Sequence, residues 1–240
     1  MLEKSTVSKQ DIKSLLLEKY GIHEVDSITS LKGGSANCYR IQASQGEFVL
    51  KEFQSEYTVA DVKMEPEINE FLREGGIPTA RFTPTETGEC VWQYRDHAFH
   101  LQEYVSGTIF PGNGAPDWLV RESASLLGKL HQAFTGFPLM REGIGEQWLS
   151  EWNVDVIRHK YSALIDAAEH LAQGGRRGQI LEDLRYKVAL LPKVAQIHID
   201  LDRLTRRNSH GDYHVLQLIC GSSSTYSIWT CLSQISGELT

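Results

Sequence analysis

Residues 206–220 have the sequence RRNSHGDYHVLQLIC, in which His-Gly-Asp-Tyr-His at positions 210–214 directly precedes an apolar run. We expect a loop around Asp212 and a strand over residues 215–220. An aspartate in such a loop can accept a proton from a substrate hydroxyl or orient that hydroxyl. Asp212 is therefore a candidate catalytic residue, with His210 and His214 holding the loop. The simpler alternative is a turn in which Asp212 caps backbone donors and the histidines are structural.

A metal site is a second functional interpretation of the same segment. Residues 198–200 and residues 210–212 both have the spacing His-x-Asp. Metal-dependent hydrolases use clusters of this kind. The other histidines are scattered through segments with helical patterns, so this interpretation is the weaker one.

The composition indicates a folded protein with one large domain or two small lobes. The chain has 240 residues, of which 41% are hydrophobic and 23% are charged. This is enough apolar material for a substantial core. The net charge of −7 argues against a general nucleic-acid-binding protein, which needs a basic face. We therefore expect no nucleic-acid partner.

The sequence also predicts where the protein resides. No apolar run approaches the roughly 20 residues of a membrane-spanning helix, and the first ten residues contain no apolar signal region. Four cysteines are spread along the chain without a CxxC pair, a pattern typical of reduced thiols. We therefore expect a cytoplasmic protein with no membrane contact.

The first hundred residues are rich in predicted strands. An amphipathic helix is expected over residues 8–20, capped by Ser8. Strands are expected at about residues 28–31, 38–43, 47–53, 81–86, 89–94 and 98–104. Residues 59–74 have a helical pattern, but Pro66 inside this pattern predicts a break near Glu65.

Beyond a Gly- and Pro-rich linker at residues 106–116, the pattern becomes helical. Asp117 is expected to cap a helix that ends near Phe134. Two more helices are expected over residues 153–173 and 178–191. A strand-rich part followed by a helical part predicts two lobes.

Lys51 is the second candidate functional residue. It ends the apolar run 48–51, and the alternation of side chains along a strand places Val49 and Lys51 on one face. A lysine on an inward face needs an anionic partner, because burial of an unpaired ammonium is costly. Glu65 or Glu67 on the next element can supply a carboxylate, and a phosphate is another suitable anion. The alternative is a lysine at a strand end that simply reaches water.

The loop Lys32-Gly33-Gly34-Ser35-Ala36-Asn37 lies between two predicted strands. Glycines and small polar residues let backbone N–H groups approach phosphate oxygens. The loop does not have Gly-Lys-Ser/Thr at the spacing of a Walker A motif. Taken alone, it favours an ordinary hairpin turn over a phosphate-binding loop.

Together, these segments resemble the aminoglycoside phosphotransferase and choline kinase-like family, whose members are relatives of protein kinases. "SHGDYH" resembles the family's catalytic loop and is the most specific match. "FVLKEF" resembles the strand with the nucleotide-binding lysine, and "HLQEYVSG" resembles the hinge strand. "LREGGIPTARF" resembles the passage after the helix glutamate, and "LLGKLHQAF" resembles the first helix of the larger lobe. The ordered resemblance extends over residues 25–231.

The resemblance implies an α+β, protein-kinase-like fold with two lobes. Residues 1–105 would form an N-terminal lobe with a five-stranded antiparallel sheet and a helix. Residues 106–240 would form a mainly helical lobe that contains the His-Gly-Asp loop. The implied activity is ATP-dependent phosphotransfer to a hydroxyl of a small molecule, such as an aminoglycoside, choline or homoserine, with Mg²⁺ as the metal.

The resemblance assigns a role to each matching residue. Asp212 would be the catalytic base, with His210 beside it in the loop. Lys51 would contact the α- and β-phosphates of ATP and pair with Glu65, with Glu67 as the alternative partner. The other nucleotide contacts would come from Gly33, Gly34 and Ser35 at the phosphates and from the backbone of Glu103 and Val105 at adenine.

The chain departs from the family pattern at the metal site. The family has an asparagine five residues after the aspartate, and here that position is Gln217, which implies a weak metal ligand. The family then has a metal-binding aspartate on the following strand, but Asp212 is the last aspartate of this chain and Glu238 is the only later acid. Phosphoryl transfer relies on metal to neutralise developing charge. The alternative is therefore a catalytically inactive pseudokinase that binds nucleotide or a protein partner.

The C-terminal end is short for this family, whose members continue with more helices after the catalytic loop. This leaves three interpretations open: a truncated relative, an internally deleted relative or a genuine pseudokinase. Loss of the helices would expose apolar side chains such as Trp229 and Leu232. This exposure would favour self-association.

Overall fold

A computed structural model describes residues 3–31, 36–112, 114–138, 153–171, 174–197, 206–210, 213–221, 226–228 and 237–239. The chain divides into two compact units. The first unit comprises Met1–Pro138 and His210–Ile235, and the second comprises Leu139–Ser209 and Ser236–Thr240. The predicted boundary between residues 105 and 106 falls inside the first unit, so a lobe boundary at this point stays a prediction.

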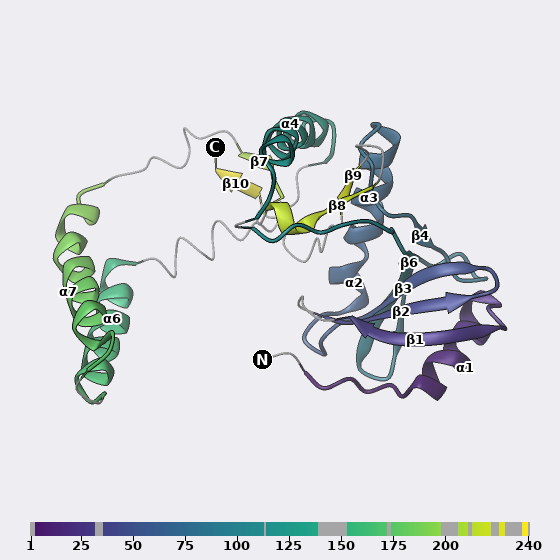
Figure 1. The fold of residues 1–240 in the computed structure, drawn as a ribbon, viewed down its shortest axis with the longest axis horizontal. Coiled ribbons are helices and arrows are strands. Elements are labelled where there is room, and N and C mark those ends of the chain that lie inside the picture. The colour runs from purple at the N-terminus through teal and green to yellow at the C-terminus, as the bar shows by residue number, and fades with distance from the viewer. Residues whose placement is uncertain are drawn as a thin grey trace. The chain divides into compact units, whose positions relative to one another are not determined.

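Among the described residues, six strands form an antiparallel sheet in the first unit (Figure 1). The strands are β1 (Val25–Leu31), β2 (Asn37–Ala43), β3 (Gly46–Glu52), β4 (Phe82–Thr83), β5 (Val91–Tyr94) and β6 (His97–Glu103). Their order is β1-β2-β3-β6-β4, and β5 also pairs with β6. The α+β class is confirmed, and each of the six strands expected from the sequence is present, one more than the five-stranded sheet that the resemblance implied.

Helix α1 (Lys9–Tyr20) covers one face of this sheet (Figure 1). Ser8 and Asp11 form a reciprocal capping box at its start, which confirms the predicted cap. Gly21 ends the helix with a φ of 62°, a left-handed conformation that suits glycine. The shared core contains Ile12, Leu15 and Leu16 of α1 with Tyr39, Ile41, Leu50, Phe99 and Leu101 of the sheet.

The opposite face of the sheet carries a second core and two short helices, α2 (Val59–Val62) and α3 (Met64–Glu74). This core contains Cys38, Val49, Phe53, Val62, Val91 and Ala98. The predicted helix break falls at Lys63, because Pro66 has no N–H to donate to the carbonyl of Val62. Pro66 lies in the first turn of α3, where helices tolerate proline, and the adjacent Glu65 is buried.

The first unit continues with α4 (Asp117–Phe134) and, after the catalytic-loop segment, with the paired strands β8 (Leu218–Cys220) and β9 (Tyr226–Ile228). Two local predictions need correction. Pro116 stands at the cap of α4 without a capping side chain, and Asp117 is the first helical residue, where its charge suits the helix dipole. Residues 215–217 form a 3₁₀ turn, so the predicted strand is confined to β8.

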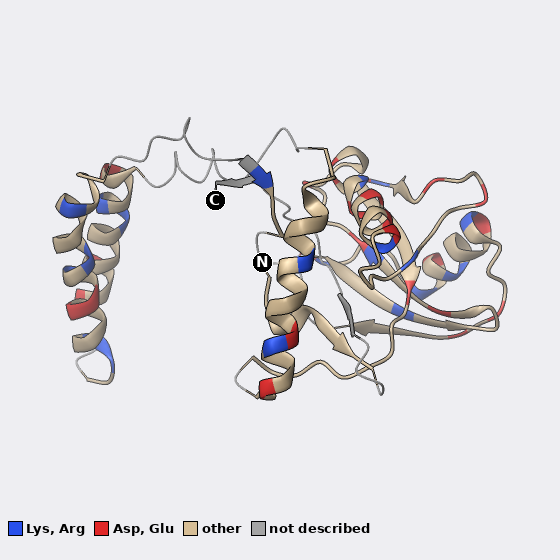
Figure 2. Cartoon of the chain, turned by 90° about the horizontal axis from the view of Figure 1, so that it is seen from above, with Lys and Arg blue, Asp and Glu red and all other residues tan. Residues whose placement is uncertain are grey.

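The second unit contains the helices α6 (Val154–Glu169) and α7 (Arg177–Val194) and the paired strands β7 (Arg206–Asn208) and β10 (Gly237–Leu239). Both helices were expected. Arg177 donates hydrogen bonds to the carbonyls of Ala168 and Glu169 at 3.1 and 2.8 Å, which joins the two helix ends. Basic and acidic residues are mixed along both helices (Figure 2).

None of the helices in the described part of the chain is long and apolar enough to cross a membrane.

The capping box of α1 yields a stability prediction. Ser8→Ala should lower the free energy of unfolding by about 1 kcal/mol, because the first turn of α1 loses its side-chain acceptor. Urea unfolding at pH 7 measures the change. Ser14→Ala is the matched control, because Ser14 lies exposed within α1, and it should be neutral or slightly stabilising. Equal effects of the two substitutions would contradict the capping role.

Candidate active site

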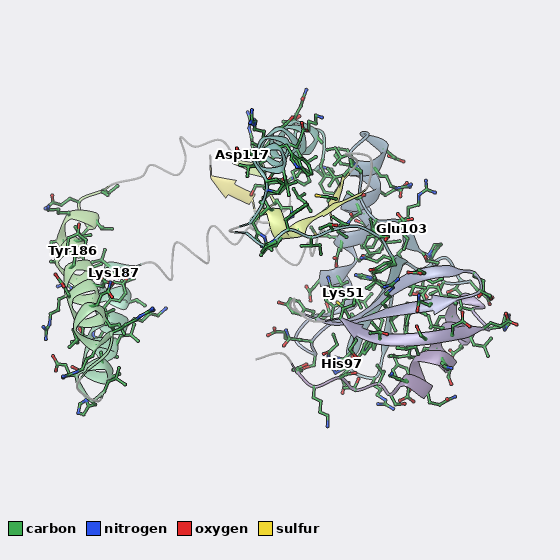
Figure 3. The ribbon with its side chains drawn as sticks, viewed as in Figure 1. Lys51, His97, Glu103, Asp117, Tyr186 and Lys187 are labelled. Carbon is green, nitrogen blue, oxygen red and sulfur yellow. The ribbon has the colours of Figure 1, made fainter. Side chains whose placement is uncertain are left out.

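A buried ion pair between Lys51 and Glu65 lies at the centre of the candidate site. Lys51 Nζ is 3.0 Å from Glu65 Oε1 and 3.3 Å from Oε2. The two residues are only 5% and 4% exposed. Lys51 is on the sheet face that carries α2 and α3 (Figure 3). The predicted pair is therefore present, and its carboxylate comes from Glu65, whereas Glu67 is exposed.

The sheet register explains why Lys51 is buried. Lys51 pairs with Cys38 of β2 on one side and with His100 of β6 on the other, so its backbone lies within the sheet. The alternative of a strand-end lysine in water is wrong. Glu65 lies in the first turn of α3, where a negative charge is favoured by the helix dipole.

His100 is a third member of this buried cluster. Its Nε2 lies 3.2 Å from Glu65 Oε2, and the residue is completely buried. The sequence predictions do not include His100; its only signal is an inward position in the apolar strand that precedes the hinge. A single strand pattern does not reveal which helix lies over that face.

The electrostatics of the cluster favour an ionised glutamate. Burial opposes ionisation of Glu65, but the charge of Lys51 and then the interaction with His100 outweigh it and lower the pKa of Glu65 to about 2. Burial lowers the pKa of His100 below its ordinary value. A cationic Lys51, an anionic Glu65 and a neutral His100 give the cluster no net charge.

The predicted hinge begins at Glu103, the last residue of β6 (Figure 3). The Glu103 N–H donates to the carbonyl of Arg81 at 2.8 Å, and the Glu103 carboxylate accepts from the Arg81 N–H at 2.9 Å. The N–H of Tyr104 donates to the carbonyl of Glu47 at 2.9 Å. These bonds fix the start of the hinge, and Val105 follows in an irregular segment. Adenine binding by Glu103 and Val105 stays a prediction.

The segment after the hinge is tied to the strand that follows the catalytic loop. Thr108 and Cys220 exchange two backbone hydrogen bonds of 2.8 and 2.9 Å. A Cβ at Gly107 would lie 2.5 Å from Ile219 Cγ2 and 2.6 Å from the carbonyl oxygen of Cys220. Only glycine allows this approach. From the sequence alone, Gly107 indicates only a flexible linker, because the residues that it contacts, Ile219 and Cys220, lie more than a hundred positions further along the chain.

The catalytic-loop segment is anchored to α4. His210 is buried, and its ring makes a T-shaped contact with Tyr213, with centroids 5.6 Å apart. The Tyr213 hydroxyl donates to the carbonyl of Ser123 at 2.8 Å. His214 is exposed. Tyr213, which follows the predicted catalytic position in the sequence, is thus bound to α4 and packs against His210.

Several predicted residues lie outside the described part of the chain. They are Gly33, Gly34 and Ser35 of the glycine-rich loop, Gly211 and Asp212 of the catalytic loop, the His-x-Asp at 198–200, and the C-terminal Trp229 and Leu232. Their roles stay predictions. Among the described residues, no three histidine, cysteine or acidic side chains come together as a metal site.

Gln217, the predicted metal ligand, is buried at the end of the 3₁₀ turn. Its Oε1 has no hydrogen-bond partner among the described residues, so a cation or a donor would satisfy it. Mg²⁺ in nucleotide sites is usually held by one or two carboxylates together with phosphates. The described residues therefore fit a divalent metal only in part, since they supply one neutral oxygen.

A comparison with protein-family models decides the family. A model described as the phosphotransferase enzyme family (APH) matches residues 27–218. The chain belongs to this family. The resemblance inferred from the catalytic loop, the lysine strand and the hinge is thus confirmed. No curated protein sequence matches the chain.

Solved structures of kinase-like proteins share the fold. An amicoumacin kinase in complex with AMP-PNP, Ca²⁺ and its substrate has a TM-score of 0.64 at 14% identity, covering 93% of this chain and 64% of its own. A spectinomycin phosphotransferase in complex with ADP and spectinomycin has a TM-score of 0.62 at 14% identity, covering 93% and 68%. An aminoglycoside phosphotransferase from Alicyclobacillus acidocaldarius has a TM-score of 0.62 at 15% identity, covering 98% and 69%. The protein-kinase-like fold is confirmed, and the chain spans about two thirds of the length of these proteins.

The close approach at Gly107 can be tested directly. Gly107→Ala should lower the free energy of unfolding by about 1–3 kcal/mol, because the added methyl overlaps Ile219 and the β8 backbone. Gly112→Ala is the control, since nothing lies within 4 Å of a Cβ at that position. Urea unfolding of both variants gives the comparison. A Gly107→Ala variant as stable as the control would contradict the predicted contact.

The Lys51–Glu65 pair predicts a pH-dependent stability. Because the folded-state pKa of Glu65 is about 2 and its ordinary value is 4.5, its contribution is present above pH 4.5 and is lost as the pH falls towards 2. Glu65→Gln should lower the free energy of unfolding at pH 7 by about 3–5 kcal/mol, because Lys51 loses its counter-charge. The difference from the unmodified protein should shrink in urea titrations from pH 5 to pH 2.5.

Glu67→Gln is the matched control for this titration, because Glu67 is an exposed acid in the same helical turn. It should change stability by less than about 0.5 kcal/mol at either pH. If Glu65→Gln and Glu67→Gln behave alike at pH 7, the ion pair does not stabilise the fold.

Proposed function

We propose that the chain is an ATP-dependent phosphotransferase that transfers the γ-phosphoryl group to a hydroxyl of a small molecule. The observation that carries this proposal is the buried Lys51–Glu65 pair in a chain that belongs to the phosphotransferase family. Kinase-type sites use a strand lysine, held by a helix glutamate, to orient the phosphates of ATP. The same pair, from β3 and α3, is present here.

The other residues have proposed roles at the phosphates, at adenine and at the acceptor hydroxyl. Gly33, Gly34 and Ser35 cover the phosphates, and the backbone of Glu103 and Val105 binds adenine. Asp212 orients the acceptor hydroxyl and accepts its proton. His210 supports the loop, an arrangement favoured by its burial against Tyr213.

A divalent metal ion such as Mg²⁺ would neutralise charge on the phosphates when bound. Gln217 is the one described residue proposed to contact it. An amide oxygen supplies a dipole but no negative charge, so we propose that the metal is held weakly. The use of a divalent ion is supported by the amicoumacin kinase complex, which contains Ca²⁺ with AMP-PNP.

The proposed acceptor is a hydroxyl-bearing amine of the aminoglycoside, choline or homoserine type. Spectinomycin and amicoumacin in the structurally similar enzymes support this class, although a fold does not specify a substrate. We place the activity in the cytoplasm, where ATP is available. Among the described residues, Cys90 and Cys220 are thiols rather than disulfides, which suits a reducing compartment.

A specific observation favours a second function, that of a pseudokinase that binds nucleotide or a protein partner without phosphotransfer. No acid occurs between Asp212 and Glu238 in the sequence. The strand β9 pairs Ile228 with Leu218, the neighbour of Gln217, and Trp229 follows in the sequence where the family has its metal-binding aspartate. Loss of this carboxylate removes a charge that Mg²⁺ requires.

The proposed function predicts nucleotide binding with weak turnover. ATP should raise the melting temperature of the unmodified chain, and the double variant Lys51→Met/Glu65→Gln should bind ATP about ten- to a hundredfold more weakly, because a charge-assisted contact to phosphate is lost. The double substitution leaves no buried unpaired charge. Thermal shift and calorimetry, each with and without Mg²⁺, measure the binding.

Turnover separates the two functions. A coupled ADP-release assay across aminoglycosides and amino alcohols should show little phosphotransfer by the unmodified chain. The turnover rate of W229D should be about tenfold higher or more, because a carboxylate is restored for the metal. Adding Asp212→Asn to W229D should abolish the gain. Nucleotide binding with no turnover by W229D would favour the pseudokinase. A protein that no nucleotide stabilises would contradict both functions.

A further inference from the structure

The carboxylate of Glu65 is shared between two partners. Lys51 Nζ approaches Oε1 at 3.0 Å, and His100 Nε2 lies 3.2 Å from Oε2. His100 stands opposite Lys51 in the β3–β6 register, so both side chains project from the same sheet face towards α3. Lys51 Nζ also lies 3.3 Å from Oε2, so Oε1 contacts Lys51 alone and Oε2 contacts both partners.

The hydrogen-bond pattern identifies the protonation state of His100. The ring Nδ1 is buried and has no hydrogen-bond partner in the described part of the chain. A doubly protonated ring would bury an N–H without an acceptor, which is costly. A neutral ring with its proton on Nε2 donates to Glu65 and leaves Nδ1 as a bare lone pair. The lowered pKa of His100, caused mainly by burial, agrees with this neutral form.

Packing fixes the orientation of the His100 ring. Phe53 and Phe82 contact it edge to face, with centroid distances of 5.2 and 4.7 Å, and Val91 pairs with it from β5. Among the described residues of β3, β4, β5 and α3, the charged groups that face the ring are Lys51 and Glu65. The ring therefore presents its Nε2–H to one acceptor from a rigid apolar setting.

We propose that His100 is a positioning residue for the Lys51–Glu65 pair. A glutamate carboxylate rotates through a broad range about its last torsion, and a single cation does not fix its plane. His100 donates to Oε2 alone, so it holds that oxygen and keeps Oε1, the oxygen nearer to Lys51, directed at the ammonium. His100 thereby sets the place of the ammonium that meets the phosphates of ATP, and in this respect the inference rests on the proposed function.

Acid should weaken this arrangement. Because its folded-state pKa is lowered, His100 stays neutral at pH 7 and protonates only below its ordinary value of 6.5. The imidazolium would place a second cation beside Lys51 and bury an N–H at Nδ1 without an acceptor. ATP affinity should therefore fall as the pH is lowered from 7 to 5.

Two variants of nearly equal size separate the hydrogen bond from packing. The amide of His100→Gln can donate from about the position of Nε2, whereas His100→Met fills similar space without a donor. We expect His100→Gln to bind ATP within about threefold of the unmodified protein and His100→Met to bind about tenfold more weakly at pH 7.5. Both variants should lose less affinity between pH 7 and 5 than the unmodified protein.

Two measurements do not depend on nucleotide. ¹⁵N NMR of histidine-labelled protein, assigned with the His100→Gln variant, should show a neutral ring protonated on Nε2 at pH 7.5. A double-mutant cycle of His100→Met and Glu65→Gln in urea unfolding should show coupling between the two residues.

The outcomes distinguish this inference from the proposed function. Equal ATP affinities of the Gln and Met variants, a ring protonated on Nδ1, or no coupling in the cycle would each overturn the role of His100. A protein that binds no ATP, yet shows the Nε2–H ring and the coupling, would contradict the proposed function and leave His100 as the group that positions Glu65. If His100→Met does not fold, the NMR signal and the pH dependence of His100→Gln decide.

Discussion

The buried ion pair of Lys51 and Glu65 is the constraint on which the first unit depends. Desolvation of the two charges costs several kcal/mol per ion unless geometry and further hydrogen bonds compensate for it. Compensation requires β3 to lie between β2 and β6, and it requires α3 to begin at the right residue above that face. The sheet register, the helix break at Lys63 and the donor on His100 all contribute to this one arrangement.

Contacts between segments far apart in the chain complete the site. Gly107 lets the segment after the hinge approach β8 so closely that Thr108 and Cys220 pair through their backbones. Tyr213 ties the catalytic-loop segment to Ser123 of α4. Backbone hydrogen bonds thus hold the segment after the predicted hinge, whereas a side-chain hydroxyl holds Tyr213 to α4.

The predicted metal site is where the sequence departs from the family pattern. The lysine–glutamate pair of the proposed nucleotide site is complete, while Gln217 is the one described residue of the proposed metal site and offers a neutral oxygen. Phosphotransfer relies on metal ions to neutralise developing charge on the phosphates, and in the proposed site the described positive charge is that of Lys51. The proposal therefore separates nucleotide binding from turnover, and the two proposed functions differ in turnover alone.

The sequence by itself determined the features that depend on neighbouring residues. The capping box of Ser8, the strand phases and the inward position of Lys51 follow from local periodicity and local hydrogen bonds, and the His-Gly-Asp segment indicated the family. Tertiary structure decided which acid pairs with Lys51, that His100 joins the pair, and that Gly107 must be glycine. These features depend on contacts between residues brought together by folding, and such contacts leave no periodic signal along a single chain.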